Sequence, residues 1–121
     1  MSTILLIDDE DLLQDLMAHA LSPEGYEILR ASDGQAGIEM ARLHVPDLII
    51  TDMSMPKMTG WEMIETLRQD EKTSAIPVLA LTAHKTADDR SAGYAAGVTD
   101  YEVKPVDMAR LKRKIVKLLN A

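Results

Sequence analysis

Four short apolar runs in this chain each lead directly into residues that can take part in phosphate or metal chemistry. The runs and the residues that follow them are 4–7 with Asp8 and Asp9, 48–51 with Asp52, 78–81 with Thr82, and a weaker run near 98–103 with Lys104. Helical patterns separate the runs, and strand–helix alternation of this kind indicates a parallel sheet with helices on both faces. The carboxyl ends of parallel strands share one edge, so these polar residues are expected to meet there.

The expected fold is an α/β domain with a doubly wound, five-stranded parallel sheet. In chain order, the predicted strands lie at 4–7, 26–31, 48–51, 78–81 and 98–103, and helices begin near 11, 34, 60, 86 and 108. One inward stripe of the first helix is expected to contain Leu12, Leu13, Leu16, Met17, Ala20 and Leu21. The helix over 86–96 consists mainly of small residues and is expected to be the most mobile.

Length and charge narrow the classes of function. The 121 residues suit one domain with a single core and are too few for two. A net charge of −7 argues against direct binding to nucleic acid or to an acidic membrane surface. The chain opens without a basic, apolar leader, and its longest apolar runs are far shorter than a membrane span. We therefore expect a cytoplasmic protein.

Four consecutive acidic residues, 8–11, precede the first predicted helix. Acidic side chains favour a helix N-terminus, so capping is one interpretation. One acid is enough for a cap, however, and four adjacent carboxylates repel one another unless a cation lies nearby. Magnesium prefers a few carboxylates together with waters. Metal binding is therefore the favoured interpretation for Asp8 and Asp9, whereas Glu10 and Asp11 are interpreted as solvated residues at the helix start.

The later strand ends supply the remaining reactive groups. Asp52 is either a turn residue before Pro56 or a nucleophile whose carboxylate attacks phosphorus, with magnesium offsetting the charge of the incoming phosphoryl group. Taken alone, Thr82 fits ordinary strand propensity, but beside Asp52 its hydroxyl can donate to a phosphoryl oxygen. Lys104 is either a solvated lysine or an ammonium that its strand directs at the acidic residues.

These motifs together resemble the response-regulator receiver domains of two-component signalling, in particular the stand-alone chemotaxis type. The matching pieces are ILLIDDE at 4–10, DLIITDMSMPKMTG at 47–60, LTA at 81–83 and DYEVKP at 100–105. Each piece is weak alone, but together they occur in the family's order and spacing and cover the chain. The resemblance implies one receiver domain over 1–121, without an output domain, and a flavodoxin-like strand order 2-1-3-4-5.

The resemblance also implies roles for individual residues. Asp52 would be the phosphoacceptor, Thr82 and Lys104 would act with it in catalysis, and Thr82 and Tyr101 would form the switch. Tyr101 is equally compatible with a core position on the fifth strand. The implied Mg²⁺ ligands are Asp9 and Asp52 directly, Asp8 through water, and the backbone carbonyl of Ser54. A cis peptide bond is expected between Lys104 and Pro105.

For such a domain the phosphoryl donor would be a histidine kinase or a histidine phosphotransfer domain. Phosphorylation would change the surface of the helix over 86–96, the fifth strand and the last helix, and so regulate a downstream protein target. A homodimer that forms on phosphorylation is a further expectation. The last helix carries Arg110, Lys112, Arg113, Lys114 and Lys117. These residues form either a solvated face, which we favour, or a docking face for an acidic partner or a second subunit.

Two other classes of function remain as alternatives. One is a magnesium-dependent phosphohydrolase with an aspartyl nucleophile, but the haloacid dehalogenase type requires a second Asp at position 54, which is Ser, and a cap over the substrate. The other is a receiver-like scaffold that is never phosphorylated. The complete set of Asp8, Asp9, Asp52, Thr82 and Lys104 argues against that possibility. The domain is not expected to be an enzyme beyond its own phosphorylation and dephosphorylation.

Overall fold

The computed structural model describes residues 2–53, 58, 60–82 and 97–120. The strands are β1 (Thr3–Ile7), β2 (Glu27–Ala31), β3 (Leu48–Asp52), β4 (Val78–Thr82) and β5 (Asp100–Val103). The helices are α1 (Asp11–Leu21), α2 (Gly34–His44), α3 (Gly60–Gln69) and α5 (Met108–Leu119), with a 3₁₀ turn, η1 (Ser22–Glu24), after α1. The helix expected over 86–96 lies outside the described residues.

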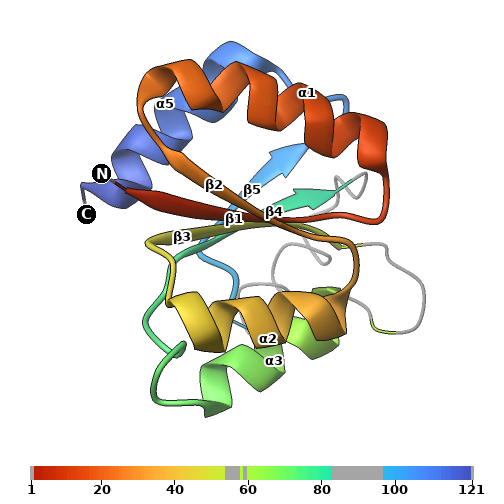
Figure 1. Ribbon diagram of the computed structural model, residues 1–121, viewed down its shortest axis with the longest axis vertical. Coiled ribbons are helices and arrows are strands. Elements are labelled where there is room, and N and C mark those ends of the chain that lie inside the picture. The colour runs from red at the N-terminus through yellow and green to blue at the C-terminus, as the bar shows by residue number, and fades with distance from the viewer. Residues whose placement is uncertain (1, 54–57, 59, 83–96, 121) are drawn as a thin grey trace.

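The five strands form one parallel sheet in the order β2-β1-β3-β4-β5. Figure 1 shows α1 and α5 on one face of this sheet and α2 and α3 on the other. The doubly wound α/β fold and the strand order that the resemblance implied are therefore confirmed. In the described part of the chain, no helix is long and apolar enough to span a membrane.

The apolar runs are continuous because helices cover both faces of the sheet. Successive strand residues point to opposite faces, so each run feeds two hydrophobic clusters. In β1, for example, Ile4 and Leu6 belong to the cluster under α1 and α5, whereas Leu5 and Ile7 belong to the cluster under α2 and α3. The strands at the centre of the sheet, β1, β3 and β4, are buried along almost their whole length.

The apolar stripe predicted for α1 is partly wrong. Met17 and Leu21 are buried as expected, but 66% of Leu12 and 55% of Leu16 is exposed. The buried face of the helix is centred on Gln14, which is polar and interrupts the pattern. At 100° per residue, Leu12 and Leu16 lie on the side of the helix opposite Gln14. Hydrophobicity alone therefore assigned two leucines to the wrong face.

The helix caps and the peptide bond before Pro105 follow the sequence signals. The Asp33 carboxylate accepts a hydrogen bond from the Ala36 N–H at the start of α2, and the Asp107 carboxylate accepts one from the Arg110 N–H at the start of α5. The peptide bond between Lys104 and Pro105 is cis, as expected. Thr59, whose position before α3 and hydroxyl side chain suit an N-cap, lies outside the described residues.

Candidate functional site

Three carboxylates meet at the carboxyl edge of the sheet. One oxygen from each of Asp8, Asp9 and Asp52 lies within 4.8 Å of the others. Asp52 is the last residue of β3, and Asp8 and Asp9 follow the end of the adjacent β1. Asp8 and Asp52 are buried, whereas Asp9 is exposed. The convergence expected from the strand ends is thus observed, with two inner carboxylates and one open to solvent.

Asp8 makes hydrogen bonds through its backbone and through one of its two carboxylate oxygens. Its N–H donates to the Ala31 carbonyl, and its Oδ1 accepts the Glu10 N–H at 2.9 Å. Its Oδ2 is buried and has no hydrogen-bond partner among the described residues. Asp8 therefore combines the two interpretations of the acidic run, because one oxygen accepts a backbone N–H before α1 and the carboxylate also belongs to the acidic cluster.

The pKa of Asp8 is raised from 3.8 to about 6, mainly by burial and also by the neighbouring Asp52 and Asp9 charges, against the opposing effects of the Glu10 N–H and Lys104. Between these two pH values the native state binds more protons than the unfolded state. The free energy of unfolding therefore falls as the pH rises from about 4 to about 6 in metal-free solution.

Replacing Asp8 by Asn is therefore expected to stabilise the metal-free protein at about pH 7, by on the order of 1–3 kcal/mol, and to have little effect at about pH 3. Urea unfolding with a chelator present, at both pH values, measures the difference. Glu27→Gln, at an exposed position on β2, serves as the control. An equal effect of Asp8→Asn at the two pH values would contradict the assignment.

Lys104 places an ammonium on the candidate nucleophile. Its Nζ lies 3.0 Å from Asp52 Oδ1, and the Asp52 side chain is almost fully buried. The Lys104 N–H also donates to the Thr82 carbonyl at 2.8 Å, which continues the ladder between β4 and β5. Lys104 is thus directed at the carboxylates rather than into bulk water.

The structure places the two predicted switch residues on adjacent strands. Thr82 is buried as the last residue of β4, one position beyond Leu81, which pairs with Asp52. Tyr101 is buried on β5 in the cluster under α2 and α3, which agrees with its core interpretation. The catalytic and switch roles of these residues remain predictions. Ser54, the predicted carbonyl ligand, lies outside the described residues.

A glycine allows α3 to begin close against the end of β3. The Gly60 N–H donates to the Met53 carbonyl at 3.2 Å. A Cβ on Gly60 would lie 2.8 Å from Met53 Cα and 3.1 Å from the Asp52 carbonyl oxygen, closer than side-chain carbons approach backbone. The absence of a side chain at this position therefore lets the chain turn back directly behind Asp52.

The acidic cluster has the donor chemistry of a magnesium site. Magnesium takes oxygen ligands, keeps several waters, and is usually held by one or two carboxylates. The unpartnered buried Oδ2 of Asp8 fits such a role, because a buried carboxylate oxygen is costly without a cation or a donor. Asp9 is exposed, so this carboxylate is accessible to the waters that such a metal keeps.

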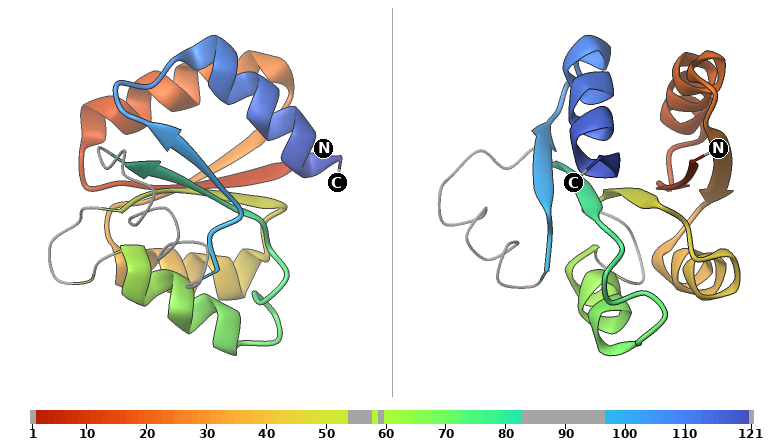
Figure 2. Two further views of the ribbon diagram at one scale, coloured as in Figure 1. Left: turned by 180° about the vertical axis from the view of Figure 1, so that it is seen from behind. Right: turned by 90° about the vertical axis from the view of Figure 1, so that its left-hand side faces the viewer.

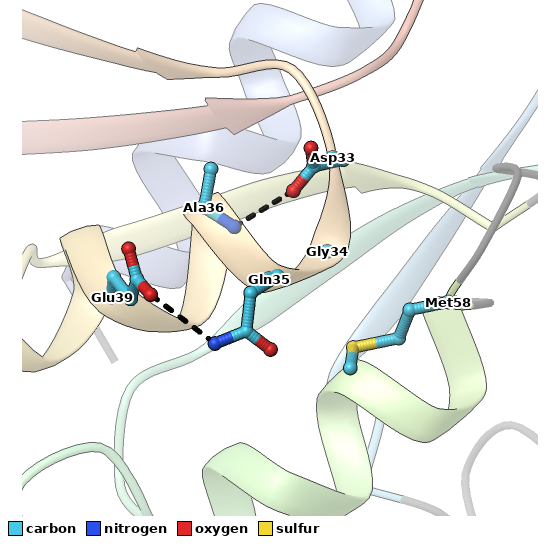
Figure 3. A pocket seen from close by; sticks show the side chains of 6 residues that line it. All are labelled: Asp33, Gly34, Gln35, Ala36, Glu39 and Met58. Atoms are coloured by element: carbon cyan, nitrogen blue, oxygen red, sulfur yellow. Dashed lines mark hydrogen bonds between the residues drawn. The ribbon is translucent and has the colours of Figure 1, made fainter.

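A separate surface pocket of about 530 Å³ lies between the start of α2 and Met58. Figure 3 shows its lining, in which the Asp33 carboxylate accepts the Ala36 N–H and Glu39 accepts a hydrogen bond from Gln35. Its polar groups serve the helix itself. We assign no reaction to this pocket.

Among the described residues, the buried polar side chains missed from the sequence include Gln14 and Glu102. Gln14 lies at the centre of the inward face of α1, and a helical-wheel plot would have revealed it as the polar residue among apolar ones. Glu102 is 1% exposed on β5 and pairs with Arg110 at 2.8 Å and with Lys114 at 3.1 Å. Figure 2 shows β5 at the edge of the sheet with α5 beside it. The spacing of Arg110 and Lys114, one helical turn apart, was the available signal.

The doubly wound sheet with an acidic cluster at its carboxyl edge defines the class of protein to which the chain belongs. Residues 4–116 match the family model of the response regulator receiver domain. The chain belongs to this family. It is 39% identical over 119 residues to the DNA-binding dual master transcriptional regulator RpaA of Synechocystis, covering 98% of this chain but 49% of that protein. The chain spans about half the length of several curated relatives that it matches.

Solved structures show the same architecture at full coverage. The chemotaxis response regulator CheY4 of Vibrio cholerae superposes with a TM-score of 0.93 at 30% identity, covering 98% of each chain. The receiver domain of the sensor histidine kinase PA1611 from Pseudomonas aeruginosa has a TM-score of 0.91 at 28% identity, covering 99% of this chain and 98% of that one. That structure has a magnesium ion coordinated in its active-site cleft. The resemblance to chemotaxis-type receivers is thus confirmed.

Proposed function

We propose that this domain is a phosphorylation-dependent switch that accepts a phosphoryl group on Asp52 from a phosphohistidine of a sensor kinase or phosphotransfer protein. The observation that carries the proposal is the placement of a buried Asp52 beside both an ammonium and two further carboxylates. One strand end with an acid is common in proteins. Here three strand ends bring together the candidate nucleophile Asp52, two further carboxylates and a lysine. This combination matches the requirements of phosphoryl transfer.

In the proposed reaction a carboxylate oxygen of Asp52 forms a bond to phosphorus as the phosphorus–nitrogen bond to the donor imidazole breaks. Lys104 holds one Asp52 oxygen and offers its positive charge to the incoming phosphoryl oxygens. The Thr82 hydroxyl is proposed to donate to a phosphoryl oxygen. Bound Mg²⁺, held directly by Asp9, Asp52 and the Ser54 carbonyl and through water by Asp8, would supply positive charge that offsets repulsion between nucleophile and phosphoryl group.

The proposed output is a change of surface. Phosphorylation replaces the single negative charge of the Asp52 carboxylate by a phosphoryl group that carries about −1.5 to −2. Thr82 and Lys104 are then drawn to the phosphoryl oxygens, and Tyr101 shifts between two packings at the surface formed by 86–96, β5 and α5. Residues 1–121 are proposed to act as one receiver domain in the cytoplasm that regulates a protein target, with dimerisation as one readout and without direct contact to nucleic acid.

The direct test is incubation with acetyl phosphate and Mg²⁺, followed by intact-mass measurement. One added phosphoryl group per chain is expected with Mg²⁺, and none is expected when a chelator is present in place of the metal. Multiple turnover of phosphate esters would instead favour the phosphohydrolase alternative. An unmodified chain that still binds its partner would favour the scaffold.

The exposed leucines of α1 predict where the donor protein binds. Leu12 and Leu16 are one turn apart on the helix that begins beside Asp9, and apolar side chains at the rim of a site suit contact with a protein donor. Replacing both by Ser is expected to slow phosphotransfer from a phosphorylated histidine phosphotransfer protein by about tenfold or more. The reaction with acetyl phosphate should be unchanged, because a small molecule needs no docking surface.

Leu43→Ser is the matched control, since Leu43 is also exposed but lies at the end of α2 on the other face of the sheet. Equal slowing by both changes, or equal slowing with acetyl phosphate, would rule out a specific docking surface on α1.

A further inference from the structure

Gln14 is a polar residue in an otherwise apolar contact. Its side chain is 2% exposed and lies on the inward face of α1 beside Met17 and Leu21. An amide buried in this way is costly unless its donors and its acceptor are all satisfied. The contacts of Gln14 therefore indicate why a polar residue occupies this position.

All the hydrogen-bonding groups of the Gln14 amide are in use. Its Nε2 donates to the carbonyl of Asp8 at 2.8 Å and to the carbonyl of Ala31 at 2.5 Å. Its Oε1 accepts from Arg30 Nε at 2.9 Å. The same Ala31 carbonyl also accepts the Asp8 N–H. One side chain thus joins the ends of β1 and β2 to the first helix.

The Asp8 carbonyl belongs to the peptide unit that connects Asp8 to Asp9. The β1 strand ends at Ile7, so the ladder of β1 and β3 no longer holds the chain at this point. The orientation of this peptide sets ψ of Asp8 and φ of Asp9, and therefore the relative directions of two of the three clustered carboxylates. Gln14 fixes that peptide by donating a hydrogen bond to its carbonyl oxygen, while the Glu10 N–H donates to the Asp8 carboxylate.

We propose that Gln14 is a positioning residue for the carboxylate cluster: by fixing the peptide between Asp8 and Asp9 it sets the affinity of the site for Mg²⁺. The proposal rests on the proposed function, in which these carboxylates hold the metal. Arg30 extends the arrangement to the surface, because its bond to Oε1 orients the amide so that Nε2 faces the two carbonyls. The Arg30 Nη2 in turn binds the carboxylate of Asp15.

The test compares Gln14→Met with Met17→Ala. Gln14→Met keeps the length and bulk of the side chain but removes both donors. Met17→Ala lies on the same helix, is equally buried and destabilises the core without touching the loop. Titration calorimetry gives the Mg²⁺ dissociation constant without any phosphorylation. We expect Gln14→Met to raise this constant about tenfold or more, as loss of an outer-shell partner does at metal sites, and Met17→Ala to leave it unchanged.

Phosphorylation by acetyl phosphate provides a second readout. In Gln14→Met the half-saturating Mg²⁺ concentration should rise while the rate at saturating Mg²⁺ stays near that of the unchanged protein. An unaltered dissociation constant in folded Gln14→Met, or equal weakening by Met17→Ala, would overturn the proposal.

If Gln14→Met does not fold, the role of the Gln14 amide can be tested with Arg30→Met instead. Arg30 is partly exposed on β2, and its loss removes the bond that orients the amide together with an exposed ion pair to Asp15, which does not contact the carboxylate loop. The Mg²⁺ dissociation constant should then rise about threefold, a smaller effect than direct loss of the donors. No change would refute the role of the amide. Failure of the unchanged protein to bind Mg²⁺ would instead refute the proposed function.

Discussion

Replacing Asp52 by Asn is expected to abolish phosphorylation by acetyl phosphate in the presence of Mg²⁺. The amide oxygen is a poor nucleophile, and the substitution also removes one of the three clustered carboxylates and the charge that pairs with Lys104. Intact-mass measurement should show no added phosphoryl group under conditions that modify the unchanged protein completely.

Asp33→Asn is the matched control for this experiment. Asp33 follows β2 and caps α2, and Asn caps a helix about as well as Asp. This variant should be phosphorylated at the normal rate. A phosphoryl group on Asp52→Asn would move the phosphoacceptor to another residue and remove the basis of the proposed switch.

The double change Arg110→Ala with Lys114→Ala is expected to lower the free energy of unfolding by about 3–5 kcal/mol. Glu102 is buried, and these two α5 side chains neutralise its carboxylate. Lys114 also donates to the Tyr101 carbonyl. Their removal leaves a buried charge without an ionic partner among the described residues, and urea unfolding measures the loss.

The cost should disappear when the carboxylate is removed as well. Glu102→Leu in the same background replaces the buried charge by an apolar side chain, and buried ion pairs exchanged for apolar residues are often neutral or stabilising. Lys112→Ala controls for loss of charge on α5, since its pair with Glu24 is solvent-exposed and should contribute less than about 1 kcal/mol. A small effect of the Arg110 and Lys114 changes would show that Glu102 is hydrated in the native protein.

The fold and the carboxylate cluster were predictable because both depend on order along the chain. Continuous apolar runs are typical of strands buried on both faces, and parallel strands share their carboxyl edge, so Asp8, Asp52 and Lys104 had to lie near one another. The strand order itself came from the resemblance to a known family. Apolar periodicity does not determine which strand lies at the centre of a sheet.

The errors arose where a polar residue occupies a buried position. Counting only apolar residues placed Leu12 and Leu16 in the core and ignored Gln14, whose burial depends on carbonyls from two other elements. Glu102 is buried for the same reason, since its partners come from α5. The partners of such residues lie on other elements, so apolar periodicity alone does not predict their burial.

The sequence also did not predict the ion pairs that the basic residues of α5 form within the domain. These residues were interpreted mainly as a solvated face. Of the five, Arg110, Lys112 and Lys114 form ion pairs with acidic residues of β5 and of the turn after α1. Three of the five basic side chains of α5 therefore form ion pairs within the domain. The docking interpretation then depends mainly on Arg113 and Lys117.

The bond between the Lys104 N–H and the Thr82 carbonyl joins the hydroxyl-bearing and amine-bearing positions through their main chains. A movement of Thr82 that keeps this bond is therefore expected to shift the backbone of Lys104 as well. The end of β4 is in this way connected directly to the start of the segment that leads into α5.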